Sequence, residues 1–436
     1  MKKIFVYILG VILAVSQLAA QDTLNLDESI QIALENNYGI LIAKNDAQVS
    51  KNNAHKGAAG LLPVISFAGS GNYQNNATKL EFASPEFPPI DQSGAQSITY
   101  QAGITANYTL YSGGRNKNNY QVLKTSALLS ETQSKATIEA TMTQVANAYY
   151  TIARLALSYK TLQENLDISQ KRLSRAKNQQ EFGSANKLIV LNAEVDINTD
   201  STNLLTSFYN LENAKRSFNR LIGRPIDTPF TLDIFLGFEE MISLEALMEN
   251  ALANNVQMRL AEYNQQISEL NLTIAKGAYK PSLSLSAGYN YTTTENDAGL
   301  IISQRTLGPS VGASLNFDIF AGNTRKVNEQ NAKISLENSR YQLEDTRLNL
   351  ERDLANAYYT YQNNLSQLRL EEKSLNAAEE NFRRTEEALK LGQSNSLQFR
   401  EAQLNLQRAK DRLDDLKYTA KLSEIEVLRL SGKLVD

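Results

Sequence analysis

The side chains that could do chemistry are few in this sequence and lie far apart. Histidine occurs once, at His55, and cysteine is absent, which excludes thiol nucleophiles and cysteine metal sites. A lone histidine is more often a surface or packing residue than a catalyst. The acid pairs Glu371-Glu372 and Glu386-Glu387 are typical of solvated helix faces. The sequence contains no motif of a phosphate-binding loop, a nucleophile elbow or a zinc site. We therefore expect no enzyme, with no catalytic, cofactor-binding or metal-binding residues.

The first 20 residues have the pattern of a secretory signal peptide. Two lysines precede an apolar stretch over residues 4–15, and Ala19-Ala20 offers a small-residue cleavage site. The alternative, a single anchoring helix, is disfavoured by the polar residues that begin at Gln21. The rest of the sequence has no apolar run of 18 residues, so any residence in a membrane is expected to come from a β-barrel or from partners.

The charge balance excludes one class of partner. The formal net charge is -3, or -5 once Lys2 and Lys3 leave with the signal peptide. Neither sign dominates, so we expect no nucleic-acid binding. The length of 436 residues suffices for two or three ordinary domains or for one large elongated one.

The chain contains one unit twice. Shifted by 209 residues it matches itself from Gly103 to Gly223, and Ala-Asn-Ala-Tyr-Tyr-Thr at 146–151 recurs at 355–360. Two copies are too few for a solenoid and predict an internal duplication within one fold. The resulting division is a signal peptide over 1–20, a first repeat over 21–223, a linker or equatorial segment over 224–243, and a second repeat over 244–436.

Each repeat is expected to contain one strand pair, 64–74 with 98–112 and 282–293 with 307–320. Apolar and polar residues alternate there, which places an apolar, aromatic set and a small, polar set on opposite faces. A soluble sandwich would give the same alternation. However, four strands are few for a sandwich of this length, and tyrosines near the strand ends resemble the aromatic girdle of membrane strands.

Long helices account for most of the remainder, as two helical hairpins over 115–222 and 324–431. Residues 116–181 would span roughly 100 Å if helical throughout. Apolar residues recur at alternating spacings of three and four, which predicts coiled-coil packing. Asp200 falls in this apolar seam, and the sequence offers no explanation for it.

The strands are expected to find partners in other chains. Four strands cannot close a barrel, and open strand edges do not survive in lipid. Eight strands would form a narrow, filled barrel, whereas larger numbers leave a lumen. Three chains would supply twelve strands, although the pattern itself does not fix the number three.

Several short motifs, in order, resemble the TolC-type outer membrane efflux protein family across the whole mature chain. They are Leu26-Asp27-Glu28-Ser29-Ile30, Ala33-Leu34, Asn36-Asn37, Leu62-Pro63, Leu110-Tyr111-Ser112-Gly113-Gly114-Arg115 and the repeated glycine turns of the hairpins. The resemblance implies a mainly α-helical chain with a membrane β-barrel, in which a homotrimer builds a twelve-stranded barrel and an α-helical tunnel. It also implies a periplasmic adaptor, an inner-membrane transporter and outer-membrane lipid as partners.

The function implied by this resemblance is an exit duct in the outer membrane, extending into the periplasm. It would serve a tripartite efflux pump or a type I secretion system and pass drugs, small molecules or polypeptides. One alternative is a passive outer-membrane porin, but porins devote most of their length to strands. The other is a periplasmic or surface coiled-coil structural protein, which would not account for the paired strands.

The resemblance also implies a pore constriction at Gln398 and Glu401, of which only Glu401 is acidic. The latch positions of the family would fall on Leu188, Ile189, Leu389 and Ser394, none of which is ionisable. This predicts a closed end held by apolar packing, with Glu401 from each subunit forming a cation-selective ring. The alternative is that Glu401 is a solvated helix residue.

The turns of the two hairpins are the expected docking sites for the adaptor. They comprise Gly183, Ser184 and Ala185 in the first hairpin and Gly392, Gln393 and Ser394 in the second. The glycines suit a left-handed residue at a helix C-terminus, and Asn186 and Ser394 or Asn395 can cap the next helix. Capping alone would explain these residues. The expected tip surface is small and polar, which suits docking end to end with another helical hairpin.

Overall fold

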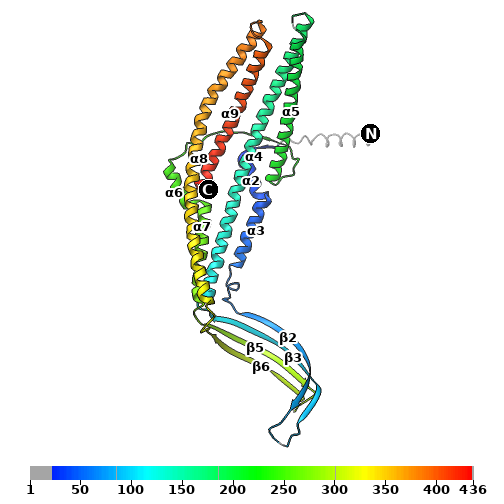
Figure 1. Cartoon of the computed structure of the whole chain (residues 1–436), viewed down its shortest axis with the longest axis vertical. Coiled ribbons are helices and arrows are strands. Elements are labelled where there is room, and N and C mark those ends of the chain that lie inside the picture. The colour runs from blue at the N-terminus through cyan, green and yellow to red at the C-terminus, as the bar shows by residue number, and fades with distance from the viewer. Residues whose placement is uncertain (1–21, 85, 185, 300, 435–436) are drawn as a thin grey trace, which may run out of the picture. The chain divides into compact units, whose positions relative to one another are not determined.

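The computed structural model describes residues 22–84, 86–184, 186–299 and 301–434, so the expected signal peptide lies outside the described residues. The chain is mainly helical (Figure 1). Its elements are β1 (Asp22–Leu24), α2 (Leu26–Asn36), α3 (Tyr38–Asn53), β2 (Val64–Leu80), β3 (Ile90–Tyr111), α4 (Arg115–Glu181), α5 (Lys187–Leu221), β4 (Phe230–Leu232), α6 (Leu244–Asn254), α7 (Val256–Gly277), β5 (Ser282–Asn296), β6 (Ser303–Asn316), α8 (Thr324–Lys390) and α9 (Ser396–Leu430).

The chain forms two compact units, each built from segments of both expected repeats. The helical unit takes the described parts of residues 1–45, 132–259 and 345–436. The sheet unit takes residues 46–131 and 260–344. In the described part of the chain, no helix has both the length and the apolar character needed to cross a membrane.

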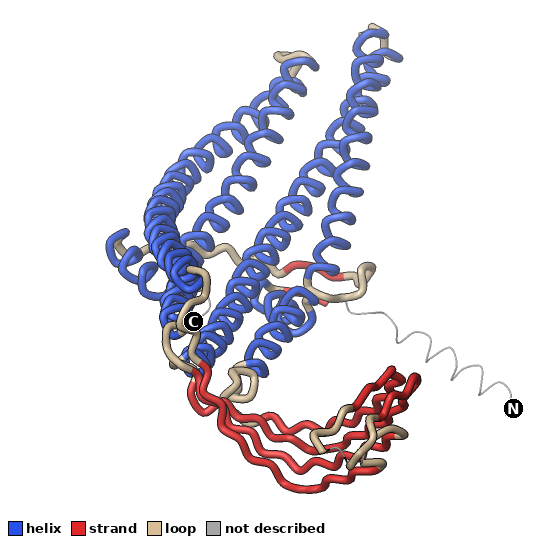
Figure 2. Tube along the Cα trace, turned by 60° about the horizontal axis from the view of Figure 1, so that its bottom comes forward, coloured by secondary structure: helices blue, strands red, loops and turns tan. Residues whose placement is uncertain are grey.

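The sheet unit contains a four-stranded antiparallel sheet in the order β2-β3-β5-β6, whose strands run side by side in Figure 2. The register aligns Phe67, Ile104, Tyr289 and Pro309 on one face, and Ser66, Thr105, Gly288 and Ser310 on the other. The expected division into an apolar and a small polar face is therefore present. Phe67, Tyr289 and Val311 of the apolar face are exposed in the single chain.

The strand ends differ from those expected from the sequence. The pairing of β2 with β3 continues to Leu80 and Ile90, so both strands extend well beyond the expected bounds at residues 74 and 98. Most residues there are polar, and backbone pairing extends the strands without the alternation of apolar and polar residues that predicted them. The expected strands 282–293 and 307–320 become β5 and β6. β6 stops at Asn316 because its partner Ser282 is the first residue of β5.

The helical unit is built around two helical hairpins, α4 with α5 and α8 with α9 (Figure 1). α4 and α8 have 67 residues each, and α5 and α9 have 35 each. The aromatic pair Tyr149 and Tyr150 of the repeated hexapeptide is buried, with ring centroids 5.4 Å apart, in a cluster that also holds Phe218. This pair packs as core residues, as helical spacing predicts for aromatics.

The segment over residues 230–243, which we call the strap, joins α5 to α6 and is fixed by side chains of the hairpins. The hydroxyl of Tyr149 donates to the carbonyl oxygen of Asp233 at 2.5 Å, and Tyr361 donates to that of Glu239 at 2.8 Å. The ammonium of Lys421 donates to the carbonyl oxygen of Gly237 at 2.7 Å. Burial raises the pKa of both tyrosine hydroxyls, which keeps them protonated and able to donate.

His55 lies just beyond the end of α3. Its Nδ1 accepts hydrogen bonds from the backbone N–H groups of Gly57 and Ala58, at 3.1 and 3.3 Å. The imidazole thus closes a local turn before β2, which gives this histidine a structural role.

Candidate functional site at the hairpin turns

The first hairpin turn reverses the chain through a left-handed glycine. Gly183 has φ +72°, which a residue with a Cβ adopts only with strain, although nothing lies within 4 Å of a Cβ placed there. The N–H of Ser184 donates to the carbonyl oxygen of Gln179 at 2.8 Å, a bond typical of glycine-terminated helices. The side chain of Asn186 then caps α5 by accepting from the N–H of Ile189. Ala185 lies outside the described residues.

The second turn repeats this geometry 209 positions later. Gly392 has φ +75°, and the N–H of Gln393 donates to the carbonyl oxygen of Ala388 at 2.8 Å. Asn395 caps α9 in a capping box, in which its backbone N–H donates to Gln398. The hydroxyl of Ser394 also donates to Gln398, at 2.9 Å. Local capping therefore accounts for the backbone of both turns.

The tip surface is more apolar than the sequence suggested. Phe182 is 84% exposed and Leu391, its counterpart in the second turn, is 72% exposed. On the far side of each turn, Leu188 and Leu397 are 60% and 77% exposed. The expectation of a purely small and polar rim is wrong, because the described residues of the single chain leave these large apolar side chains exposed on either side of each turn.

The expected constriction residues lie on one face of α9. Gln398 and Glu401 are both exposed, and both line a polar cavity of about 480 Å³ together with Arg384, Gln393 and Ser394. The structure thus brings the two expected constriction residues beside the second of the expected docking turns. Of the latch positions, Leu188 is exposed, and Leu389 lines a separate cavity with Phe382 and Phe399.

A buried ionic cluster joins the two hairpins below the turns. The guanidinium of Arg400 on α9 donates two hydrogen bonds, of 2.7 and 2.8 Å, to the carboxylate of Asp200 on α5. Ser169 of α4 donates to the same carboxylate at 2.5 Å. The side chains of Asp200 and Arg400 are only 6% and 12% exposed. This cluster explains why an acid occupies the apolar seam at position 200.

A second arginine extends the cluster. Arg172 of α4 pairs with Asp196 of α5, and its side chain is 5% exposed. Burial, with a smaller contribution from the charge of Arg400, lowers the pKa of Arg172 to about 10. Its Nε has no hydrogen-bond partner in the described part of the chain. Ionic contacts therefore join the helices near the turns, in addition to the apolar packing that the sequence predicted for this end.

Part of this cluster could have been found from the sequence. Residues equidistant from the middle of a hairpin turn face each other, and Ser169 and Asp200 are equidistant from the midpoint between 184 and 185. The buried seam of α4 also turns polar there, at Asn165, Ser169 and Arg172. Arg400 was not predictable, because nothing in the pattern sets how the second hairpin packs on the first.

Comparison with known families identifies relatives over nearly the whole chain. The sequence profile of the family described as outer membrane efflux protein matches residues 29–224 and 247–433. The chain is 24% identical over 413 residues to the probable efflux pump outer membrane protein TtgC of Pseudomonas putida, covering 93% of this chain and 82% of TtgC. It is 23% identical over 425 residues to the outer membrane protein TolC of Vibrio cholerae, covering 94% and 91%.

Solved structures share the fold. A membrane protein from Pseudomonas aeruginosa superposes with a TM-score of 0.80 at 17% identity, covering 94% of this chain and 91% of that one. The Campylobacter jejuni CmeC outer membrane channel superposes with a TM-score of 0.79 at 15% identity, covering 94% and 86%.

Proposed function

The chain belongs to the outer membrane efflux protein family, and we propose that it is the exit duct of a tripartite efflux pump or a type I secretion system. Members of this family are outer-membrane channels and not enzymes. The observation that carries the proposal is that the family profile matches both halves of the chain, helical hairpins and strand pairs alike. Drugs, other small molecules or polypeptides would pass through the duct from an inner-membrane transporter.

The sheet supports assembly from several chains. Among the described residues β2 pairs only with β3 and β6 only with β5, so both edges of the sheet are free to pair. Its apolar face would contact outer-membrane lipid and its small polar face would line the lumen. Three chains would close a twelve-stranded barrel, wide enough to leave a channel. The internal duplication would give the helical tunnel of such a trimer near-sixfold symmetry.

An exposed stripe on α8 supports the same assembly. Val327, Ile334, Tyr341 and Leu348 are spaced seven residues apart, and all four are exposed in the single chain. They lie opposite the buried face of α8 that contains Leu350 and Leu354. Apolar residues at heptad spacing are typical of a coiled-coil seam, so this stripe would pack against a helix of the next subunit.

The first prediction is the number of chains in the assembly. Protein extracted from outer membranes in detergent should have the mass of three chains after correction for bound detergent, measured by light scattering. Replacing Ile334 and Tyr341 with glutamate should shift the protein to smaller species, because two charges would be buried in each seam. The same positions replaced by leucine are the control. A monomeric wild-type protein would exclude a barrel shared between chains.

The rival functions are less compatible with the chain. A passive porin would devote most of its length to strands, whereas α4 and α8 alone contain 67 residues each. A coiled-coil structural protein would have no use for a four-stranded sheet with a continuous exposed apolar face. Neither rival needs two hairpin turns of matching geometry.

The second prediction concerns which strand connections face the outside of the cell. The turns over 81–89 and 297–302 each join the two strands of one pair, and the other ends of the strands lead to helices. Since the protein lacks cysteine, single cysteines at Glu86 and Ile302 can be labelled selectively. Both should react with a membrane-impermeant maleimide on intact cells, whereas Ser184→Cys should react only after the outer membrane is permeabilised. Equal reaction of all three would overturn this topology.

The third prediction concerns selectivity at Glu401. If this carboxylate lines a constriction in the trimer, three negative charges gather there and favour cations. Glu401→Lys should then reduce or reverse the cation preference of single channels in planar bilayers, and Glu401→Gln should give an intermediate preference. Unchanged selectivity in both variants would mean that Glu401 is a solvated helix residue outside any constriction.

A further inference from the structure

Basic residues gather at one end of the four-stranded sheet, where the strands meet α3, α4, α7 and α8 (Figure 1). Four segments of the sheet unit surround this end: residues 47–62, 111–130, 270–281 and 317–336. Together they contain ten lysines and arginines but only two acids. The segments at the opposite end, over 79–91 and 295–305, contain five acids and two basic residues. Positive charge therefore marks one end of the sheet and not the sheet as a whole.

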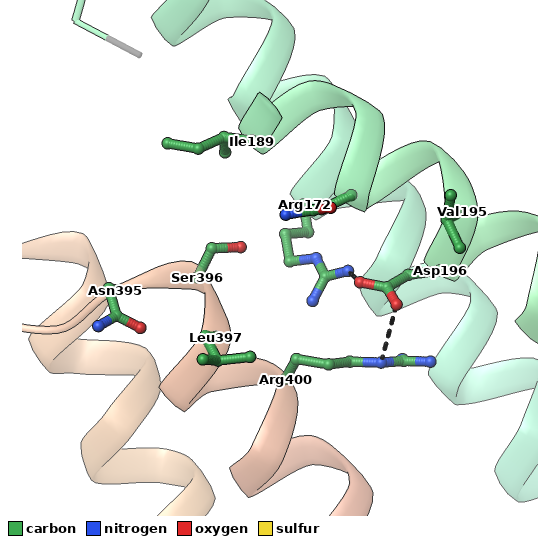
Figure 3. Close-up of a pocket in the computed structure, with 9 residues that line it drawn as sticks. Arg172, Ile189, Val195, Asp196, Asn395, Ser396, Leu397 and Arg400 are labelled. Carbon is green, nitrogen blue, oxygen red and sulfur yellow. Dashed lines mark hydrogen bonds and ion pairs between the residues drawn. The ribbon is translucent and has the colours of Figure 1, made fainter. Parts of the chain in front are cut away.

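Most of these positive charges have no acidic partner. Six of the lysines are exposed and form no ion pair with any described residue: Lys51, Lys56, Lys117, Lys276, Lys280 and Lys326. Of the two acids, Glu329 is already paired with Lys333, at 2.9 Å. Near the hairpin turns, by contrast, buried arginines have acidic partners, as Figure 3 shows for Arg172 and Asp196. The charge at the end of the sheet thus stays uncompensated within the described chain.

Helix stability does not account for four of these cations. Arg115 and Lys117 lie in the first turn of α4, and neither that turn nor the first turn of α8 contains an acid. Arg325 and Lys326 lie in the first turn of α8. The N-terminus of a helix carries a partial positive charge, so cations are unfavourable there. Only the lysines in the last turns of α3 and α7 gain from the helix dipoles. A negatively charged surface outside the chain would favour all of these positions.

The exposed apolar face of the sheet continues to the same end. Phe317 and Ile319 follow β6 at the spacing of its apolar residues, and they are 53% and 89% exposed. Tyr279, which precedes β5, is also exposed, and the guanidinium of Arg325 lies over its ring, 5.6 Å from the centroid. An apolar surface that gives way to tyrosine and then to lysine and arginine matches the edge of a lipid leaflet, where acyl chains give way to headgroups.

We propose that these basic residues form a collar that binds the anionic headgroups of phospholipids in the periplasmic leaflet of the outer membrane. The basic collar comprises residues 51–56, 115–117, 276–280 and 325–326. Its ammonium and guanidinium groups donate to phosphate oxygens, and lysine suits this role because it binds phosphate as a point charge without a fixed geometry. The inference rests on the proposed function, since it requires the sheet to lie in the outer membrane.

Spin-labelled lipids test the basic collar in reconstituted membranes. The purified protein is placed in phosphatidylcholine membranes with a trace of phosphatidylglycerol or phosphatidylcholine that carries a nitroxide near the end of one acyl chain. Electron paramagnetic resonance then separates lipid that is immobilised against the protein from free lipid. Phosphatidylglycerol should be enriched about threefold on average in the immobilised fraction, from about fivefold at the collar and little at the other membrane surface. The enrichment should disappear at roughly 1 M salt, which screens charges beyond about 3 Å.

The same spectra separate failure of this inference from failure of the proposed function. If neither lipid is immobilised, the sheet does not lie in the membrane, which overturns the proposed function together with the collar. If both lipids are immobilised equally, the sheet is embedded but the basic residues do not bind headgroups, for instance because they face the channel. That result overturns the collar alone.

Matched triple variants locate the lipid preference. The first replaces three exposed collar lysines that form no ion pair with a described residue: Lys56→Gln, Lys280→Gln and Lys326→Gln. The control replaces three exposed lysines of the helical unit and changes the net charge equally: Lys160→Gln, Lys187→Gln and Lys373→Gln. The collar variant should lower the enrichment of phosphatidylglycerol to about twofold, whereas the control should keep the wild-type value. Circular dichroism must show equal helix content in all three proteins. An equal loss of preference in both variants would overturn the collar as the binding surface.

Discussion

Replacing Ser184 and Gln393 together with arginine should abolish the proposed export while leaving the fold and the proposed trimer intact. Neither side chain forms the turn, because the reversal depends on Gly183 and Gly392 and on backbone hydrogen bonds. Ser184 loses one hydrogen bond from its hydroxyl to Gln179, worth about 1 kcal/mol, and a cation is favourable at a helix C-terminus. The fold therefore tolerates the change.

The large effect on export comes from the proposed docking surface. The turns lie among exposed apolar side chains, Phe182 and Leu188 in one and Leu391 and Leu397 in the other. A partner that covers these side chains would have to bury two added charges per chain without a counter-ion. Drug resistance, measured in a strain that lacks its own duct, should fall to the level of the empty strain.

The matched control is the pair Ser184→Ala with Gln393→Ala, which shortens the same side chains without adding charge. This control should retain most of the wild-type resistance. Trimer mass and outer-membrane abundance must be equal in all three proteins. If the arginine variant confers full resistance at equal abundance, the adaptor docks elsewhere or no adaptor is used.

Asp200→Leu should destabilise the end of the helical unit near the turns by about 3–5 kcal/mol, because it leaves Arg400 buried without its carboxylate. Ser169 would also lose its acceptor. The natural readout is amide hydrogen exchange in α5 and α9, since local opening there need not unfold the whole chain. Exchange near position 200 should accelerate about a hundredfold or more.

The double variant Asp200→Leu with Arg400→Met distinguishes the effect of the unpaired charge from the effect of altered side-chain packing. Replacing both partners of a buried ion pair with apolar residues of similar volume is often neutral or stabilising. Exchange should therefore return close to the wild-type rate. A double variant as fast as the single one would mean that the site depends on the shape of the original side chains and not on their charges.

Regular patterns in the sequence predicted the elements of the fold well. Heptad spacing predicted the long helices, and period-two alternation predicted four paired strands with an apolar and a polar face. The alternation no longer marks the strand from Asn75 to Lys79, where all residues but Ala77 are polar, because backbone pairing alone continues β2 there. The resemblance to the efflux family was confirmed by the family profile and the relatives.

The site was predicted less completely than the fold. Glycine and asparagine at the two turns were sufficient to predict their geometry, because left-handed backbone and capping are local properties. The exposure of Phe182 and Leu391 depends on the absence of neighbours, and the partner of Asp200 depends on how one hairpin packs on the other. Both are tertiary properties that a local pattern does not contain. The roles of Glu401 and of the turns in a trimer stay predictions.

Because of the way in which the strap over residues 230–243 is held, some positions should tolerate substitution and others should not. Tyr149, Lys421 and Tyr361 reach it through the carbonyl oxygens of Asp233, Gly237 and Glu239, which every amino acid possesses. The helices also contact apolar side chains of the segment, since Phe230 is buried in the core and Leu232, Ile234 and Leu236 pack against it, whereas Phe235 between them is exposed. An exposed strap position such as Phe235 can therefore vary freely among related proteins. The two tyrosines and the lysine that hold the segment are expected to vary far less.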